Sequence, residues 1–181
     1  MNTPDATAPD ASEAQLAAIA RLHEELTRRG IDYWLFGGWA VDFHAGRRTR
    51  THADIDLAVW QADAERLAAV LGGDGWNAAP GGPGYLAFER GPVRAEVALL
   101  DRDRDGTVFT PAGEERGEWP AGAFGTDLAR LEGVDARVVT LAALIEDKSA
   151  GYGDTAALAK DRADLAVLAV LSDDRGGDPG T

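Results

Sequence analysis

Two carboxylates stand two residues apart in the segment Thr51-His-Ala-Asp54-Ile-Asp56-Leu-Ala-Val-Trp60. The apolar residues predict a β-strand over 54–60, and alternation along a strand places Asp54 and Asp56 on one face. Their Cα atoms then lie about 7 Å apart, which lets both side chains converge on one hard cation or on two neighbouring cations. Unpaired carboxylates repel each other and resist burial, so the pair favours a metal site. The alternative is a strand edge that simply faces water.

A short apolar run, Tyr33 to Phe36, leads directly into two glycines, Gly37 and Gly38. A strand that ends there and opens a helix exposes backbone N–H groups where the helix dipole favours an anion. Glycine also lets a phosphate approach the backbone, whereas the alternative is a tight turn that needs a positive φ. A cluster of basic residues follows, suited to phosphate neutralisation or to a solvated loop: Arg47, Arg48, Arg50 and His52.

A third carboxylate, Glu96, lies in the segment Val93-Arg-Ala-Glu-Val-Ala-Leu-Leu100. Alternation predicts a strand whose apolar residues share one face, while Glu96 and Arg94 share the other. An exposed Arg94–Glu96 pair is one interpretation. The other is that Glu96 completes a metal site with the two aspartates or accepts a proton.

These motifs, in this order, resemble the polymerase-β-type nucleotidyltransferase superfamily. The run Trp34-Leu-Phe-Gly-Gly-Trp-Ala-Val-Asp42, followed by Gly46-Arg-x-Thr-Arg50-x-His-x-Asp-Ile-Asp-Leu57, is similar to the aminoglycoside 2''-adenylyltransferases and the related lincosamide nucleotidyltransferases. The resemblance is strong over residues 31–60 and looser over the rest of the chain.

The resemblance implies a role for each residue of the motifs. Gly37 and Gly38 would hold a nucleoside triphosphate with their backbone, and Asp54 and Asp56 would ligate two Mg²⁺ ions. Glu96 would take the third-carboxylate position, as a metal ligand, as the base for the acceptor hydroxyl, or as both. Close relatives have Asp there, and a longer side chain changes its reach.

The same comparison gives expectations for the basic residues. Arg50, His52 and Lys148 are assigned to nucleotide binding, with Asp54, Asp56 and Glu96 as the catalytic and metal-binding set. Lys160 resembles a residue of the helical segment that follows the catalytic domain in this family. The alternative for Lys160 is an ordinary surface pair with Asp164, four residues along the helix.

The elements that must position these residues follow from periodicity and from turn residues. Helices are expected from Ser12, as a capping residue, to just before Gly30, and over 39–45, 62–71, 141–152 and 155–171. Strands are expected over 33–36, 54–60, 85–89, 93–100, 107–110 and 134–139. Interleaved strands and helices with a helical end predict an α+β fold, a nucleotidyltransferase-type mixed β-sheet with helices packed on it. The expected organisation is a frayed N-terminus over 1–11, the nucleotidyltransferase domain over 12–139, a helical segment of the same unit over 140–171 and a frayed tail over 172–181.

Composition narrows the possible partners. The 181 residues carry 31 acidic and 18 basic side chains, a formal net charge of -13, which argues against nucleic-acid and membrane-surface binding. There is no cysteine, which excludes disulfides and thiolate chemistry. Because the N-terminus has neither the basic nor the apolar region of a signal peptide, we expect a cytoplasmic protein. The sequence leaves open whether it is a monomer or a homodimer.

The expected activity is an Mg²⁺-dependent transfer of a nucleoside monophosphate, from ATP or another NTP, to a hydroxyl of a small molecule. A cationic aminoglycoside is the favoured acceptor and a lincosamide the second. Alternatives are a toxin–antitoxin-type enzyme that modifies a protein, and a silent nucleotide-binding protein. An acidic segment is expected to attract the acceptor or else to remain a solvated loop: Glu89, Asp101, Asp103, Asp105, Glu114, Glu115 and Glu118.

Overall fold

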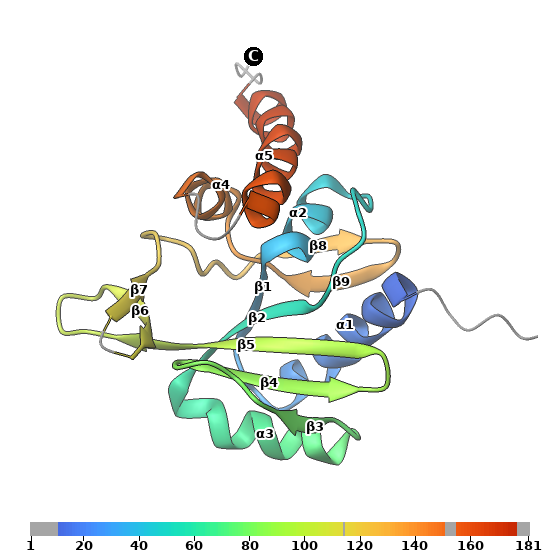
Figure 1. Cartoon of the computed structure of the whole chain (residues 1–181), viewed down its shortest axis with the longest axis vertical. Helices are drawn as coiled ribbons and strands as arrows, with labels where there is room; N and C mark the ends of the chain where they lie inside the picture. The colour runs from blue at the N-terminus through green and yellow to red at the C-terminus, as the bar shows by residue number, and fades with distance from the viewer. Residues whose placement is uncertain (1–10, 114, 151–154, 177–181) are drawn as a thin grey trace, which may run out of the picture.

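A mixed β-sheet carries the chemistry-bearing residues (Figure 1). The structure, a computed structural model, describes residues 11–113, 115–150 and 155–176. The central strands run in the order β1, β2, β5, β4, β3. Their bounds are β1 Tyr33–Phe36, β2 Ile55–Trp60, β3 Asn77–Ala79, β4 Tyr85–Arg90 and β5 Val93–Arg102. β2 and β5 are parallel, whereas the other pairs are antiparallel.

Alternation along β2 fixes its two faces. Ile55, Leu57 and Val59 are fully buried, whereas Asp56 is only partly buried. β5 follows the same rule, because Ala95 and Val97 are buried and Glu96 is partly exposed. The sheet therefore has an apolar face in the core and presents its carboxylates on the other.

Helices pack around this sheet. α1 (Ala11–Arg28) crosses behind β4 and β5, and α3 (Ala64–Gly73) lies along β3 after a single 3₁₀ turn, Gln61–Asp63 (Figure 1). α1 buries an apolar stripe of Leu16, Ile19, Leu22 and Leu26. α2 (Gly37–Ala45) follows β1 without a loop, and it packs on α4 (Leu141–Ala150) and α5 (Thr155–Gly176).

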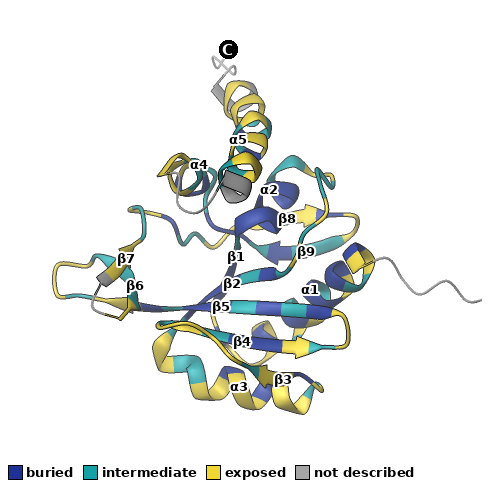
Figure 2. Ribbon diagram, viewed as in Figure 1, coloured by how far each residue is buried: buried dark blue, intermediate teal, exposed yellow. Residues whose placement is uncertain are grey.

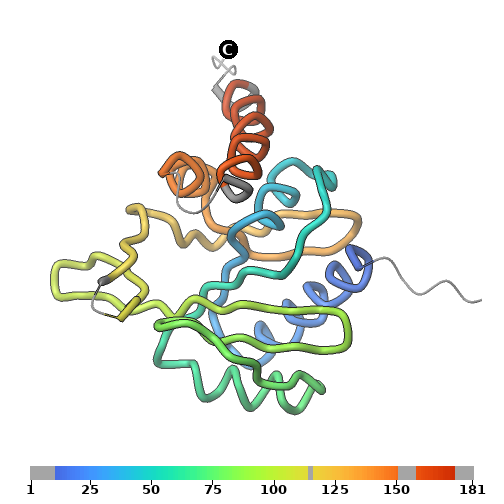
Figure 3. Tube along the Cα trace, in the orientation of Figure 1, coloured from blue at the N-terminus to red at the C-terminus, as the bar shows by residue number. Residues whose placement is uncertain are grey.

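Two hairpins complete the fold. β6 (Val108–Ala112) pairs with the end of β5 and with β7 (Glu115–Glu118), and this hairpin extends away from the main sheet (Figure 3). β8 (Leu128–Leu131) and β9 (Val134–Arg137) form a separate pair beside α2. Burial concentrates in the central strands and α2, whereas residues 169–173 of α5 are mostly exposed (Figure 2). No helix in the described residues is long and apolar enough to span a membrane.

The predicted α+β class is confirmed, and several boundaries are corrected. Ser12 lies inside α1 and is buried, so it is not the expected cap. α2 begins at Gly37 rather than Trp39 because the strand turns directly into the helix. α3 includes Gly72 and Gly73, which were expected to close it. α5 continues to Gly176, so residues 172–176 are helical rather than a frayed tail.

The other differences concern short or polar strands. β3, β7 and β8 are not predicted, β2 begins at Ile55 so that Asp54 lies just before the strand, and β9 ends at Arg137, before the expected limit at 139. β3, β7, β8 and β9 are only three or four residues long, too short for alternation to identify them. Residues 1–10 and 177–181, expected to be frayed, and 151–152, expected as a helix end, lie outside the described residues.

Candidate active site

The parallel pairing of β2 and β5 brings the three predicted carboxylates together. Asp56 stands opposite Glu96 in the register. One carboxylate oxygen from each of Asp54, Asp56 and Glu96 lies within 4.8 Å of the others. Among the described residues this is the group of three that fits a metal ion, and its all-oxygen donors suit a hard cation such as Mg²⁺. We call this group the carboxylate triad.

Burial and crowded negative charge raise the pKa values of the two aspartates of the triad. Burial, with the charges of Asp54 and Glu96, raises the pKa of Asp56 to about 7. Burial, with the charge of Glu96, also raises the pKa of Asp54. A raised pKa means that the surroundings disfavour the carboxylate form, and a bound cation would reverse this preference.

The two glycines bring the backbone against the triad and its neighbours. Gly37 has a φ of 63°, and a Cβ atom there would overlap the carboxylate of Asp56. A Cβ atom on Gly38 would overlap the His52 ring and the Arg50 guanidinium. Both glycines are therefore required by the side chains packed on them, whether or not a phosphate also binds there.

The predicted nucleotide ligands Arg50 and His52 are anchored within the protein. His52 donates from Nε2 to Asp42 Oδ2 at 2.6 Å, and Arg50 donates from NH1 to His52 Nδ1 at 3.1 Å. Trp39 lies against the His52 ring, with centroids 4.8 Å apart. Asp42 is fully buried, and its other oxygen accepts the backbone and hydroxyl hydrogens of Thr49. Both ring nitrogens of His52 are thus engaged, which fixes its tautomer.

The helical end supplies two lysines near the triad. Lys148 on α4 donates to Asp161 at 2.8 Å and contacts Asp164 at 3.2 Å, and its charge lowers the pKa of Asp56. Lys160 is exposed, and its charge lowers the pKa of Asp54. Asp164 pairs with Lys148 and Arg50 in the structure, not with Lys160.

Glu96 takes part in both arrangements expected from the sequence, the pair with Arg94 and the cluster with the two aspartates. Arg94 donates from Nε and NH2 to Glu96 Oε1, at 3.0 and 2.8 Å, and from NH1 to Glu89. The Arg94–Glu96 pair therefore exists, and it coexists with the position of Glu96 in the triad. Arg94 fixes the carboxylate by one oxygen.

A hollow of about 640 Å³ lies near the triad, although none of the three triad residues lines it. Phe36, which stands opposite Asp56 in the β1–β2 register, lines it. Tyr85 also lines it, and burial, with the charges of Asp56, Asp147 and Glu96, raises the pKa of this phenol. We call this space the acidic hollow, because its remaining walls include Trp119, Glu118, Glu146, Asp147 and the single cation Arg116.

The acidic segment expected from the sequence contributes little of this wall. Among its described members, Glu118 lines the acidic hollow, Glu89 pairs with Arg94, and Asp103 pairs with Arg116, the cation of that hollow. Asp101 and Asp105 do not line it. Glu114 lies outside the described residues.

Several residues of the site were not assigned from the sequence. Asp42, at the end of the glycine-containing motif, and Asp164, in the C-terminal helix, are buried carboxylates. Their local sequence patterns do not indicate this burial. Glu146 and Asp147 precede Lys148 on α4 and line the acidic hollow, whereas Lys148 contacts Asp161 and Asp164. The charged residues inside a mostly apolar helix were the available signal.

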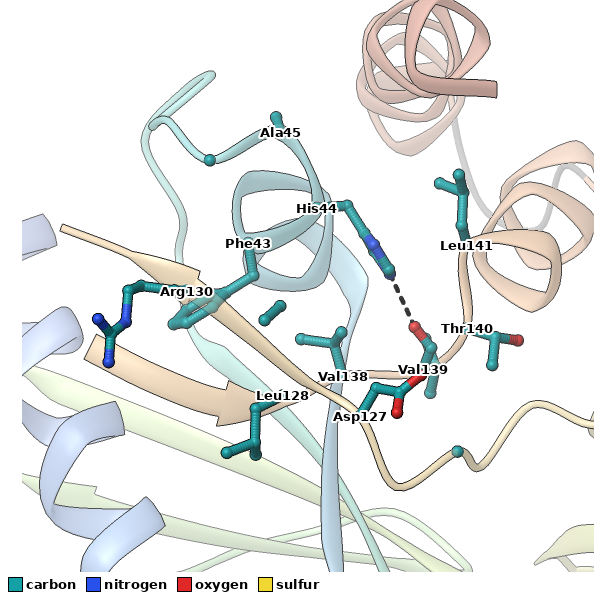
Figure 4. Close-up of a pocket in the computed structure, with 13 residues that line it drawn as sticks. Phe43, His44, Ala45, Asp127, Leu128, Arg130, Val138, Val139, Thr140 and Leu141 are labelled. Carbon is teal, nitrogen blue, oxygen red and sulfur yellow. Dashed lines mark hydrogen bonds between the residues drawn. The ribbon is translucent and has the colours of Figure 1, made fainter. Parts of the chain in front are cut away.

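A second hollow of about 490 Å³ lies on the other side of α2, away from the triad (Figure 4). Its walls are Phe43, Leu128, Val138 and Leu141 with polar Asp127 and Thr140. His44 donates from Nε2 to the Val139 carbonyl at 2.9 Å across this space. None of the triad carboxylates reaches it.

A mixed sheet that carries a carboxylate triad beside a strand–glycine–helix turn defines a nucleotidyltransferase-type domain. Solved structures of the same fold include a lincosamide antibiotic adenylyltransferase, LnuA, bound to lincomycin (TM-score 0.66, 19% identity, 88% of this chain and 97% of that chain). ANT(2'')-Ia in complex with adenylyl-2''-tobramycin has a TM-score of 0.66 at 19% identity, over 90% of this chain and 99% of that chain. The family model for aminoglycoside-2''-adenylyltransferases matches residues 18–168, and the chain belongs to this family.

Curated relatives match a shorter region. A 2''-aminoglycoside nucleotidyltransferase of Escherichia coli is 36% identical over 62 residues, 33% of this chain and 35% of the relative. A lincosamide resistance protein of Staphylococcus haemolyticus is 37% identical over 60 residues, 33% of this chain and 34% of the relative. The matched part thus spans about a third of the length of these curated relatives. The family expected from the motifs is confirmed.

Proposed function

We propose that this protein transfers a nucleoside monophosphate from a nucleoside triphosphate, ATP in the first instance, to a hydroxyl group of an aminoglycoside. The observation that carries the proposal is the carboxylate triad within 4.8 Å beside the Gly37 turn. Asp54, Asp56 and Glu96 would hold Mg²⁺, which would neutralise phosphate charge and acidify the attacking hydroxyl. Membership of the aminoglycoside-2''-adenylyltransferase family supports the same reaction.

The charges around the triad favour different positions for the two substrates. Arg50, Lys148 and Lys160 lie within electrostatic reach of the triad aspartates and suit the triphosphate. The acidic hollow carries three carboxylates against one guanidinium, together with the Trp119 and Phe36 rings. A polycation with a hydrophobic ring face fits such walls.

The reaction balances without a further reactant. The acceptor hydroxyl oxygen attacks the α-phosphorus, the bond from that phosphorus to the bridging oxygen of pyrophosphate breaks, and pyrophosphate leaves. Glu96 accepts the hydroxyl proton, since it is a partly exposed carboxylate of the triad that Arg94 fixes by one oxygen only. Positioning and charge neutralisation supply most of the rate acceleration in such transfers.

A lincosamide is the second candidate acceptor. The lincosamide resistance relative and the LnuA fold support it. A lincosamide has one amine, so it would gain less from the acidic hollow than an aminoglycoside.

Incubation with α-³²P-labelled ATP, Mg²⁺ and either tobramycin or lincomycin tests the proposal. We expect label on tobramycin, release of pyrophosphate, and loss of both with Asp54→Asn. Asp173→Asn, which removes an exposed carboxylate from α5, is the matched control and should keep the activity. Label on lincomycin alone would move the assignment to the second candidate, and label on neither in the presence of Mg²⁺ would contradict it.

A further inference from the structure

Arg50, which packs on Gly38, and Lys148 share one buried carboxylate. Asp164 on α5 is 1% exposed. It accepts hydrogen bonds from Arg50 Nε and NH2, each at 3.0 Å, and its Oδ2 lies 3.2 Å from Lys148 Nζ. Arg50 comes from the loop before β2 and Lys148 from α4, so one side chain joins three segments far apart in the sequence.

The hydrogen bonds of Arg50 within the protein use all but one of its donor hydrogens. Its Nε and one NH2 hydrogen go to Asp164, and NH1 donates to the Thr51 carbonyl and to His52 Nδ1. The guanidinium has five donor hydrogens. The remaining NH2 hydrogen belongs to the atom that a Cβ on Gly38 would overlap. Asp164 therefore sets which edge of Arg50 faces the turn.

Burying these charges needs a reason beyond stability. The side chains of Arg50, Lys148 and Asp164 are 25%, 11% and 2% exposed. Desolvation of buried ion pairs generally cancels much of their attraction, so apolar residues would stabilise the α4–α5 packing as well or better. What the ionic arrangement provides is two fixed positive charges within electrostatic reach of Asp56.

We propose that Asp164 is a positioning residue for the nucleotide site, acting through Arg50 and Lys148, and that it couples the docking of α5 to nucleotide binding. The inference rests on the proposed function, because it takes the triphosphate as the ligand of Arg50 and Lys148. Asp164 touches neither substrate nor metal in this account. Without its charge, the Arg50 fork and the Lys148 ammonium turn to other partners, and the triphosphate meets cations that are no longer held in place.

The test compares Asp164→Asn with wild-type protein and with Asp173→Asn on the same helix. We expect Asp164→Asn to raise the KM for ATP at least about tenfold, equivalent to about 1.4 kcal/mol, with a much smaller change in kcat. The Tm increase that a non-hydrolysable ATP analogue with Mg²⁺ produces should shrink in Asp164→Asn and stay unchanged in Asp173→Asn. A purely structural role would lower the Tm of the free protein without changing that increase.

Asp164→Glu keeps the charge and covers the case in which Asp164→Asn does not fold. We expect a KM for ATP between those of wild type and Asp164→Asn, at a Tm near wild type. A double-mutant cycle with Arg50→Lys should show that the two effects on KM are not additive.

The outcomes separate the two claims. If wild-type protein binds ATP but neither Asp164 variant changes its KM or the ligand-induced Tm increase, the positioning role is wrong and the proposed function stands. Additive effects of Arg50→Lys and Asp164→Asn would also overturn it. If wild-type protein binds no nucleoside triphosphate with Mg²⁺, the proposed function and this inference both fail.

Discussion

Replacing Asp56 with asparagine should stabilise the metal-free protein at alkaline pH. The pKa of Asp56 rises from its ordinary value of 3.8 to about 7 because burial and two neighbouring carboxylates disfavour its charge. Between pH 3.8 and about pH 7, Asp56 in the folded protein keeps a proton that it has released in the unfolded chain. Stability therefore falls as the pH rises through this window, and the loss is complete above about pH 7.

The pKa values set the size of the effect. A displacement from 3.8 to about 7 corresponds to about 4 kcal/mol, which is a ceiling because water entry and relaxation reduce the burial cost of an ion. We expect Asp56→Asn to gain about 1–3 kcal/mol in free energy of unfolding at pH 8 in EDTA. At pH 4, where Asp56 is protonated in the folded protein, the gain should be close to zero.

Urea unfolding followed by circular dichroism at both pH values measures this difference. Adding Mg²⁺ at pH 8 should stabilise wild type and have little effect on Asp56→Asn, because the variant lacks a metal ligand. Asp173→Asn removes one charge from the same acidic chain and controls for net charge. An Asp56→Asn protein that is no more stable than wild type at pH 8 without metal would refute the electrostatic account of the triad.

Three further predictions concern the site. Glu96→Gln should lower kcat by at least about 100-fold, the usual contribution of a general base, while Glu96→Asp keeps measurable activity. If the kcat of Glu96→Gln stays near that of wild type across pH, Glu96 is only the ion-pair partner of Arg94. Gly37→Ala should cost more unfolding free energy than Gly30→Ala, because both glycines have a φ near 64° but only a Cβ at Gly37 meets Asp56; equal losses in urea titrations would contradict this. The KM for an aminoglycoside should rise between low and physiological salt, more than that for ATP, and Asp147→Asn should reduce this rise; a constant unaffected by salt would remove the role of the acidic hollow.

The part of the site that the sequence predicts is the part that local geometry determines. Alternation puts Asp56 on the face of β2 that Asp54, the second residue before it, also approaches, and the same rule applied to β5 puts Glu96 on the matching face. The strand-to-helix turn at Gly37 follows from two glycines after an apolar run. For these residues, knowing the type of element was enough.

The remaining parts depend on how distant segments pack. Whether Arg50 faces a phosphate or a carboxylate is decided by Asp164, which lies 114 residues further along the chain. The acidic hollow is likewise formed by Glu118 from the β6–β7 hairpin and Asp147 from α4, two elements that a charge count along one segment does not bring together. No periodicity within one element contains this information.

α4 connects the two halves of the site. Its residues Glu146 and Asp147 line the acidic hollow, whereas the next residue, Lys148, contacts Asp161 and Asp164. A rotation or shift of this helix would therefore move the walls of the acidic hollow and the Lys148 ammonium together. Because Asp164 also holds Arg50, the docking of α5 fixes α4 relative to the triad. The docking of the two C-terminal helices therefore determines how positive and negative charges are placed around the triad. The buried contact between Lys148 on α4 and Asp164 on α5 is part of this docking.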